Sequence, residues 1–217
     1  MRWASGDTSQ VTSLGESQSA ILDLMNVTIQ ASKDSGEMDA ERIYTKIKDV
    51  ADQAFPNGDW PQALQPLPLV HSSIADMYKV QRNYLEAFAF GLRGCLQCRR
   101  SGQAWVHHLF DLVQHFVPLV LQPNESALFK DKKFLTEKEL WDVYHGYLRE
   151  LAITSTKVFG PNTTYSKAVK RGWDEALDSA GKPRPGTSAF AKKFKTAQAK
   201  LLAWAEVTDG KGIELSQ

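Results

Sequence analysis

Apolar side chains recur at intervals of three and four residues along most of the chain, which is the spacing of one buried face of an α-helix. In the clearest case, Leu140, Tyr144 and Leu151 lie on one stripe. Thr136 and Glu139 stand just before this stripe, and their spacing matches a capping box that would begin the helix. No segment alternates apolar and polar residues with a period of two between turn signals. The pattern therefore predicts an all-α protein.

Capping residues, prolines and glycines divide the chain into seven or eight helices. Pro118 is expected to kink or end the fifth of them, because proline lacks the backbone N–H that a helix interior needs. A proline-rich connector at 56–68 and a charged loop at 122–135 separate longer elements. The helices are predicted over residues 17–34, 39–54, 69–80, 84–99, 102–118, 136–158, 163–180 and 188–207.

The third and fourth of these helices are joined by a short polar turn, so they are expected to be antiparallel neighbours. The pattern His71-x2-Ile74-Ala75-x2-Tyr78, with Ala87 behind it, follows the spacing of a tetratricopeptide helical hairpin. Ala75 and Ala87 would let two helix backbones approach, and Gly91 and Gly94 would extend that contact. We predict an irregular helical bundle or short solenoid of antiparallel hairpins, with one tetratricopeptide-like unit near its middle.

The organisation expected along the chain is simple. Residues 1–16 are rich in Ser, Thr and Gly and are predicted to be a flexible amino-terminal segment. Residues 17–208 form a single helical domain, and residues 209–217 form a carboxy-terminal tail.

The stretch Leu69–Phe116, with the hairpin pattern above, Gly94-Cys95 and Trp105, resembles the helical carboxy-terminal region of SET and MYND type protein lysine methyltransferases. The run Phe159-Gly160-Pro161-Asn162 and its downstream aromatic residues are also similar to the way such regions close. The resemblance implies a helical region that packs against a SET domain, covers the substrate cleft and offers a groove to partners. The Asn-His-Ser/Cys element and the cysteine-rich zinc module of that family are absent here, so the resemblance implies a separate module or fragment without a methyl-transfer site.

Composition narrows the class of protein further. The chain has 217 residues, of which 42% are hydrophobic, so it can bury a core and is not predominantly disordered. With 26 Lys and Arg against 25 Asp and Glu, the net charge is +1, and no overall field would draw the chain to nucleic acid or membrane. The most apolar stretch, Leu109–Leu121, contains charged and polar residues and is not expected to span a membrane. The scarcity of cysteine favours the cytoplasm or nucleus.

Cys95 and Cys98 are candidates for a metal or redox site, because a C-x-x-C pair can supply half of a zinc site or form a redox dithiol. Redox use is disfavoured, since the pair lies late in a helix, whose dipole raises a thiol pKa. Either His107 or His108 could join a zinc site, and buried small side chains at a helix contact are the alternative interpretation. We find no paired metal-binding motif and no nucleophile or phosphate-binding motif. The sequence therefore predicts no catalytic residue, resident metal or cofactor.

The function expected from this pattern is non-catalytic binding of a protein or peptide partner by a helical scaffold. Candidate contact residues are the polar positions Asp76, Lys79, His107 and Gln114 on the first helices of successive hairpins. One alternative is the helical region of a SET-domain methyltransferase, as the resemblance implies.

A second alternative is contact with nucleic acid or chromatin through the basic final third of the chain. Lys192, Lys193 and Lys195 would carry that contact. The simpler interpretation is that these lysines form the solvent-exposed face of the last helix, opposite an apolar stripe that contains Phe190, Phe194 and Leu201.

Overall fold

The computed structural model describes residues 39–54, 66–98, 100, 102–121, 134–178, 187–207 and 212–216, together with 15–16, 18–23, 25–27 and 30. All regular secondary structure in these ranges is α-helical, which confirms the all-α prediction. Residues 18–23, 25–27 and 30 are helical, in line with the helix expected first. Residues 15–16 are helical as well, so the expectation of a flexible segment that reaches residue 16 is wrong for these two residues. The predicted flexible segment up to residue 14, most of the 56–68 connector and most of the 122–135 loop lie outside the described residues.

The seven labelled helices begin within two residues of the predicted starts. Their bounds are α2 Ala40–Ala54, α3 Leu67–Val80, α4 Tyr84–Gln97, α5 Gly102–Leu121, α6 Glu137–Phe159, α7 Thr164–Asp178 and α8 Ser188–Trp204.

Pro118 does not end α5, which continues to Leu121 with the proline inside it. Of the two outcomes expected at Pro118, an end of the helix is therefore wrong, and a kink stays a prediction. Leu119 and Val120 just beyond the proline are both buried. Their packing offsets the backbone hydrogen bond that proline removes.

Local hydrogen bonds account for where several helices begin and end. Asp39 Oδ1 accepts from Arg42 N at 2.9 Å at the start of α2. Thr136 caps α6 in the predicted capping box, with its backbone N donating to Glu139 Oε2 at 2.9 Å. Gly160, at φ +88°, follows the last residue of α6, in a backbone conformation that side-chain-bearing residues rarely adopt. These contacts satisfy backbone groups that a helix terminus otherwise leaves unpaired.

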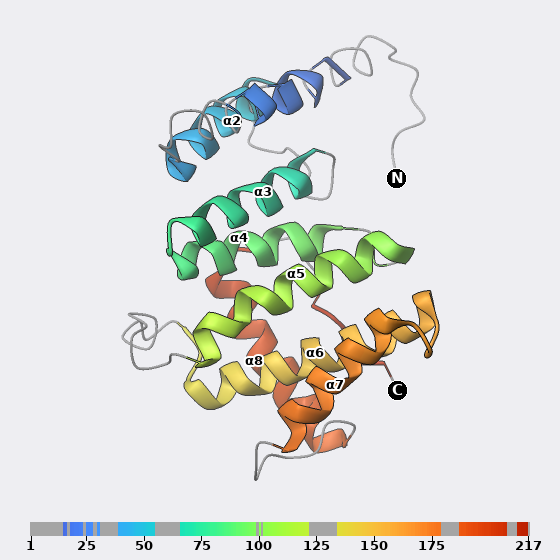
Figure 1. The fold of residues 1–217 in the computed structure, drawn as a ribbon. Coiled ribbons are helices and arrows are strands. Elements are labelled where there is room, and N and C mark those ends of the chain that lie inside the picture. The colour runs from blue at the N-terminus through green and yellow to red at the C-terminus, as the bar shows by residue number, and fades with distance from the viewer. Residues whose placement is uncertain are drawn as a thin grey trace, which may run out of the picture.

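The helices form a stack, and the last helix, α8, crosses it (Figure 1). α2, α3, α4 and α5 follow one another as layers, and α6 and α7 continue beyond α5. α8 packs against α6 and runs back across the stack to reach α4, where Trp204 stacks on Phe88 with ring centroids 6.2 Å apart. Arg93 of α4 also donates from Nε to the Ala205 carbonyl at 2.8 Å. The last helix thus joins segments that are more than a hundred residues apart.

Two separate clusters of buried apolar side chains hold this arrangement together. The carboxy-terminal cluster is the larger one; it joins α4 to α8, and Tyr147, Phe88 and Phe116 are among its largest fully buried side chains. The amino-terminal cluster joins the first helical residues, α2, α3 and one face of α4. It consists of Ile21, Met25, Ala40, Ile43, Ile47, Val70, Ile74, Ala75, Met77 and Phe90.

Small residues on α4 let it approach both neighbouring helices. Ala75 and Ala87 are buried, as predicted. A methyl group on Gly94 would lie 2.5 Å from Ser72 Oγ of α3, and one on Gly91 would lie 2.7 Å from His115 Cδ2 of α5. The two glycines therefore bring α4 close to helices on two sides rather than to α3 alone. The tetratricopeptide likeness of the α3–α4 hairpin stays a prediction.

Candidate functional site

Three of the four residues expected to contact a partner gather around a residue that the sequence did not single out, Asp111 of α5. The charges of Asp76 and Lys79 on α3 interact with Asp111, and so does that of His107, which lies one turn earlier on α5. All four side chains are exposed to solvent. We call Asp76, Lys79, His107, His108 and Asp111 the Asp111 surface. Gln114, the fourth candidate, is half-buried one turn further along α5.

The Asp111 surface contains two carboxylates from different helices, Asp76 of α3 and Asp111 of α5. Loss of surrounding water, and then the negative charge of Asp111, raise the pKa of Asp76. Loss of water also raises the pKa of Asp111, although His108, His107 and Lys79 act in the opposite direction. The pKa shifts mean that the ionised carboxylates are only partly compensated by their neighbours.

Behind this surface lies a buried histidine, His115, which is 5% exposed. Burial and, second, the charge of Lys79 lower the pKa of His115 to about 4, so the ring is neutral at pH 7. Its Nδ1 atom is buried and has no hydrogen-bond partner among the described residues. Because Gly91 offers no side chain, the ring packs directly on the α4 backbone. The ring thus serves as a neutral spacer between α4 and α5.

An aromatic group borders the Asp111 surface on the side of α7. The Tyr165 ring lies 5.3 Å from Phe159, 5.9 Å from Phe110 and 6.5 Å from His107. Burial and the Asp111 charge raise the pKa of Tyr165. These contacts link α5 and the end of α6 to α7, and the charge of Asp111 reaches the Tyr165 side chain.

The surroundings of Cys95 and Cys98 disfavour a reactive thiol. Cys95 is buried, and burial raises its thiol pKa well above the usual value. Burial also raises the pKa of Cys98 to about 11, and its Sγ donates to the Gly94 carbonyl at 3.1 Å. Both thiols are therefore protonated at neutral pH, which disfavours nucleophilic or redox use. Within the described ranges, no group of three or more His, Cys, Asp or Glu residues is arranged to hold a metal ion, so His107 and His108 do not complete a zinc site with the cysteines.

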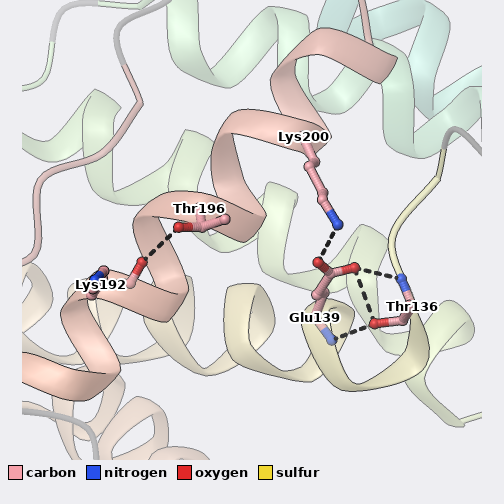
Figure 2. Close-up of polar contacts among 5 residues, drawn as sticks. All are labelled: Thr136, Glu139, Lys192, Thr196 and Lys200. Carbon is pink, nitrogen blue, oxygen red and sulfur yellow. Dashed lines mark hydrogen bonds and ion pairs between the residues drawn. The ribbon is translucent and has the colours of Figure 1, made fainter.

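The lysines of α8 lie on its solvent-exposed face, as predicted. Lys192, Lys193 and Lys195 are all exposed, and Phe190 and Phe194 are buried on the opposite side. Figure 2 shows how this helix is tied to the start of α6. There Lys200 Nζ pairs with one oxygen of Glu139, while the other oxygen accepts from the Thr136 backbone N and hydroxyl. Lys200 is thus engaged in holding two helices together.

A further set of polar side chains holds residues 212–216 against the bundle. Gln198 of α8 is 4% exposed; its Oε1 accepts from Ile213 N at 2.7 Å and its Nε2 donates to Ile213 O at 3.1 Å. Tyr147 of α6 donates from its hydroxyl to the same Oε1 at 2.9 Å. Glu150 accepts from Ser216 N at 3.0 Å and from Ser216 Oγ at 2.9 Å.

Two arginines complete this set of contacts. Arg100 donates to the Gly212 carbonyl at 2.9 Å, and Arg149 donates to the Ser216 carbonyl at 2.6 Å. We call Arg100, Arg149, Glu150 and Gln198 the tail clamp. Within residues 209–217, predicted as a tail, the described part is therefore packed on the domain, and Ile213 is only 5% exposed.

Comparison with known protein families, curated proteins and solved structures gives no match to the chain. The resemblance to the helical region of SET and MYND type methyltransferases therefore stays a prediction. Among the described residues, no helix is both long and apolar enough to cross a membrane.

Sequence reasoning missed the tail clamp, although a signal for it was present. Glu150 and Gln198 occupy positions on the buried faces of their helices, next to Leu151 and Ala197. A polar side chain at such a position costs free energy unless a partner satisfies it. The partners lie 15 and 66 residues away, and helical periodicity does not reveal them.

Proposed function

We propose that the chain is a non-catalytic helical module that binds a protein partner through the Asp111 surface. The observation that supports this proposal is the convergence of Asp76 and Asp111, two exposed carboxylates from different helices that are incompletely compensated. A Lys or Arg side chain of a partner would relieve their mutual repulsion. Such charge-assisted contacts give specificity as well as affinity.

The neighbouring side chains suit this role. Tyr165 offers an aromatic ring near Asp111, and a cation bound at this carboxylate would gain from contact with the ring face as well. Lys79 and His107 at the rim would exclude partners that present a second positive charge too close by. The partner class is therefore a peptide or protein loop with one Lys or Arg flanked by neutral or acidic residues. The free cysteines suit a reducing compartment, so we place this binding in the cytoplasm or nucleus.

Selection from a displayed random peptide library, followed by titration of the selected peptides, tests this proposal. We expect selected peptides to contain Lys or Arg, and we expect the double variant Asp76→Asn, Asp111→Asn to bind them roughly tenfold or more weakly. Asp174→Asn on α7 is the matched control, because Asp174 is an exposed carboxylate whose ion pair is with Lys170. Equal loss in the control, or no loss in the double variant, would contradict the proposal.

Contact with nucleic acid is a second candidate, favoured by the exposure of three neighbouring lysines. Lys192, Lys193 and Lys195 make no ion pair within the part of the chain that the structure describes, whereas Lys170 and Lys200 do. Titration of a duplex DNA at several salt concentrations separates this candidate from the first. Binding through these lysines should weaken steeply with added salt and be lost on reversal of all three charges.

A further inference from the structure

The tail clamp contacts the main chain of residues 212–216 far more than their side chains. Its four residues make five hydrogen bonds to backbone groups of Gly212, Ile213 and Ser216. Among the described residues, only one hydrogen bond of the clamp involves a polar side chain of this segment, the one that Ser216 Oγ donates to Glu150. Main-chain pairing of this kind is how proteins hold extended peptides, with affinity from the backbone and specificity from alternate side chains.

The central element is the buried amide of Gln198. It pairs with both the N–H and the C=O of Ile213, as a neighbouring strand would in a sheet. The Tyr147 hydroxyl fixes the orientation of this amide by donating to its oxygen. An amide that is buried and oriented in this way needs an occupant, because without one its N–H and C=O groups lose their partners.

The positions along the segment differ in what they accept. A Cβ on Gly212 would lie 2.4 Å from Gln198 Nε2, so a larger residue there would push the clamp amide away from Ile213, and glycine is favoured. Ile213 is buried and Leu215 packs against the carboxy-terminal cluster, while Glu214 is exposed. The clamp therefore selects the sequence glycine, aliphatic, any residue, aliphatic, serine.

We propose that the tail clamp is a peptide-binding site, and that an extended segment of a partner protein with this sequence pattern displaces residues 212–216 from it. The chain's own segment then acts as a tethered competitor that keeps the site closed. The clamp uses α6, α8 and Arg100, whereas the Asp111 surface uses α3 and α5, so the inference stands apart from the function proposed above.

The test uses a fluorescent peptide of residues 208–217 as the probe and the full-length chain as the receptor. Ile213→Asp places a charge in an apolar position and frees the clamp of its own segment. Since a tethered competitor acts at an effective concentration on the order of millimolar, we expect the wild-type chain to bind the probe at least about tenfold more weakly than the I213D chain.

Backbone-modified probes supply the matched controls without changing the protein. Methylation of the Ile213 nitrogen removes the N–H that donates to Gln198 and should weaken binding about tenfold or more. Methylation of the Glu214 nitrogen is the control, because that N–H makes no hydrogen bond within the described residues, and it should change binding less. A folded I213D chain that binds the probe no better than wild type, or equal binding of the two methylated probes, would overturn the proposal.

Two further outcomes are also decisive. If the I213D chain does not fold, hydrogen exchange of the wild-type chain replaces it. Excess unlabelled probe should then accelerate exchange at the Ile213 and Ser216 amides, and unchanged rates would overturn the proposal. Concentration-dependent dimers of the wild-type chain that I213D abolishes would show that a second copy, not a partner protein, supplies the segment, and would likewise overturn it.

Discussion

The amino-terminal and carboxy-terminal clusters differ in how their contacts are distributed along the chain, although α4 belongs to both. In the amino-terminal cluster the helices lie in layers, and a polar contact of 3.0 Å between His71 Nδ1 and Gln97 Oε1 joins α3 to α4 within one hairpin. The carboxy-terminal cluster is closed by contacts between distant segments, such as Arg93 with Ala205. Layered helices open locally at lower cost than elements that are tied together across the chain. We therefore expect the amino-terminal cluster to be the less stable of the two.

The largest effect should follow from emptying the centre of the carboxy-terminal cluster. Phe116 is fully buried and its ring lies 4.4 Å from that of Phe88 and 5.5 Å from that of Tyr147. Phe116→Ala should lower the free energy of unfolding by about 3–5 kcal/mol, through lost burial and the cavity left behind. Urea denaturation followed by circular dichroism measures this loss. A loss below about 1 kcal/mol would show that the cluster repacks freely.

Ile47→Ala makes the equivalent change in the amino-terminal cluster, where Ile47 is fully buried. The free energy of unfolding of the amino-terminal helices should fall by about 2–5 kcal/mol, and the rest of the domain should keep its stability. Hydrogen exchange should accelerate in α2 and in α3, while the amides of α6 and α8 keep their protection. Equal acceleration in all four helices would mean that the two clusters unfold as one unit, which would contradict a lower stability of the amino-terminal cluster.

Gly94→Ala tests how closely α4 must approach α3. The added methyl group would lie 3.0 Å from Ser72 N and 3.1 Å from Pro68 O, both backbone atoms, so a side-chain rotation cannot relieve the contact. We expect a loss of about 1–3 kcal/mol in thermal or urea unfolding. Gly172→Ala on α7 is the control, because among the described residues no atom outside the α7 backbone lies within 4 Å of the added methyl group. It should stabilise the helix by up to about 1 kcal/mol.

The smallest effect concerns acid and the buried histidine of the amino-terminal cluster. Burial lowers the pKa of His71 to about 4, from 6.5. The hydrogen bond that His71 donates to Gln97 Oε1 opposes this shift, and the charge of Arg93 adds to it. As the pH falls below 6.5, His71 becomes protonated in the unfolded chain, whereas in the folded chain it stays neutral until about pH 4. The free energy of unfolding is therefore highest above pH 6.5 and decreases as the pH falls from 6.5 to about 4.

Comparison of the wild-type chain with His71→Gln isolates this contribution, because glutamine does not titrate. Between pH 7 and pH 5 the wild-type chain should lose about 2 kcal/mol more than the variant does. Urea unfolding at both pH values measures the difference. Parallel losses in the two proteins would show that His71 does not resist protonation in the folded state.

Most of the helices could be predicted from the sequence because their signals are local. The capping box of Thr136 and Glu139 and the apolar stripe of α8 depend on residues within four positions of each other. Pro118 is the exception. Proline disfavours a helix interior locally, but α5 continues to Leu121 because the residues after the proline are buried in the core. Burial is a tertiary property, and here it outweighs the local one.

The helical class, the approximate extent of each helix and the face that each one buries could be predicted from the amino-acid pattern, because the 3.6-residue period reflects them directly. Which polar residues contact one another depends on how the helices pack. Asp76 acquires Asp111 as a neighbour across two helices, and Gln198 acquires Tyr147 and Ile213 from opposite directions along the chain. These encounters depend on how the helices pack and on where α8 recrosses the stack, and no short-range pattern carries that information.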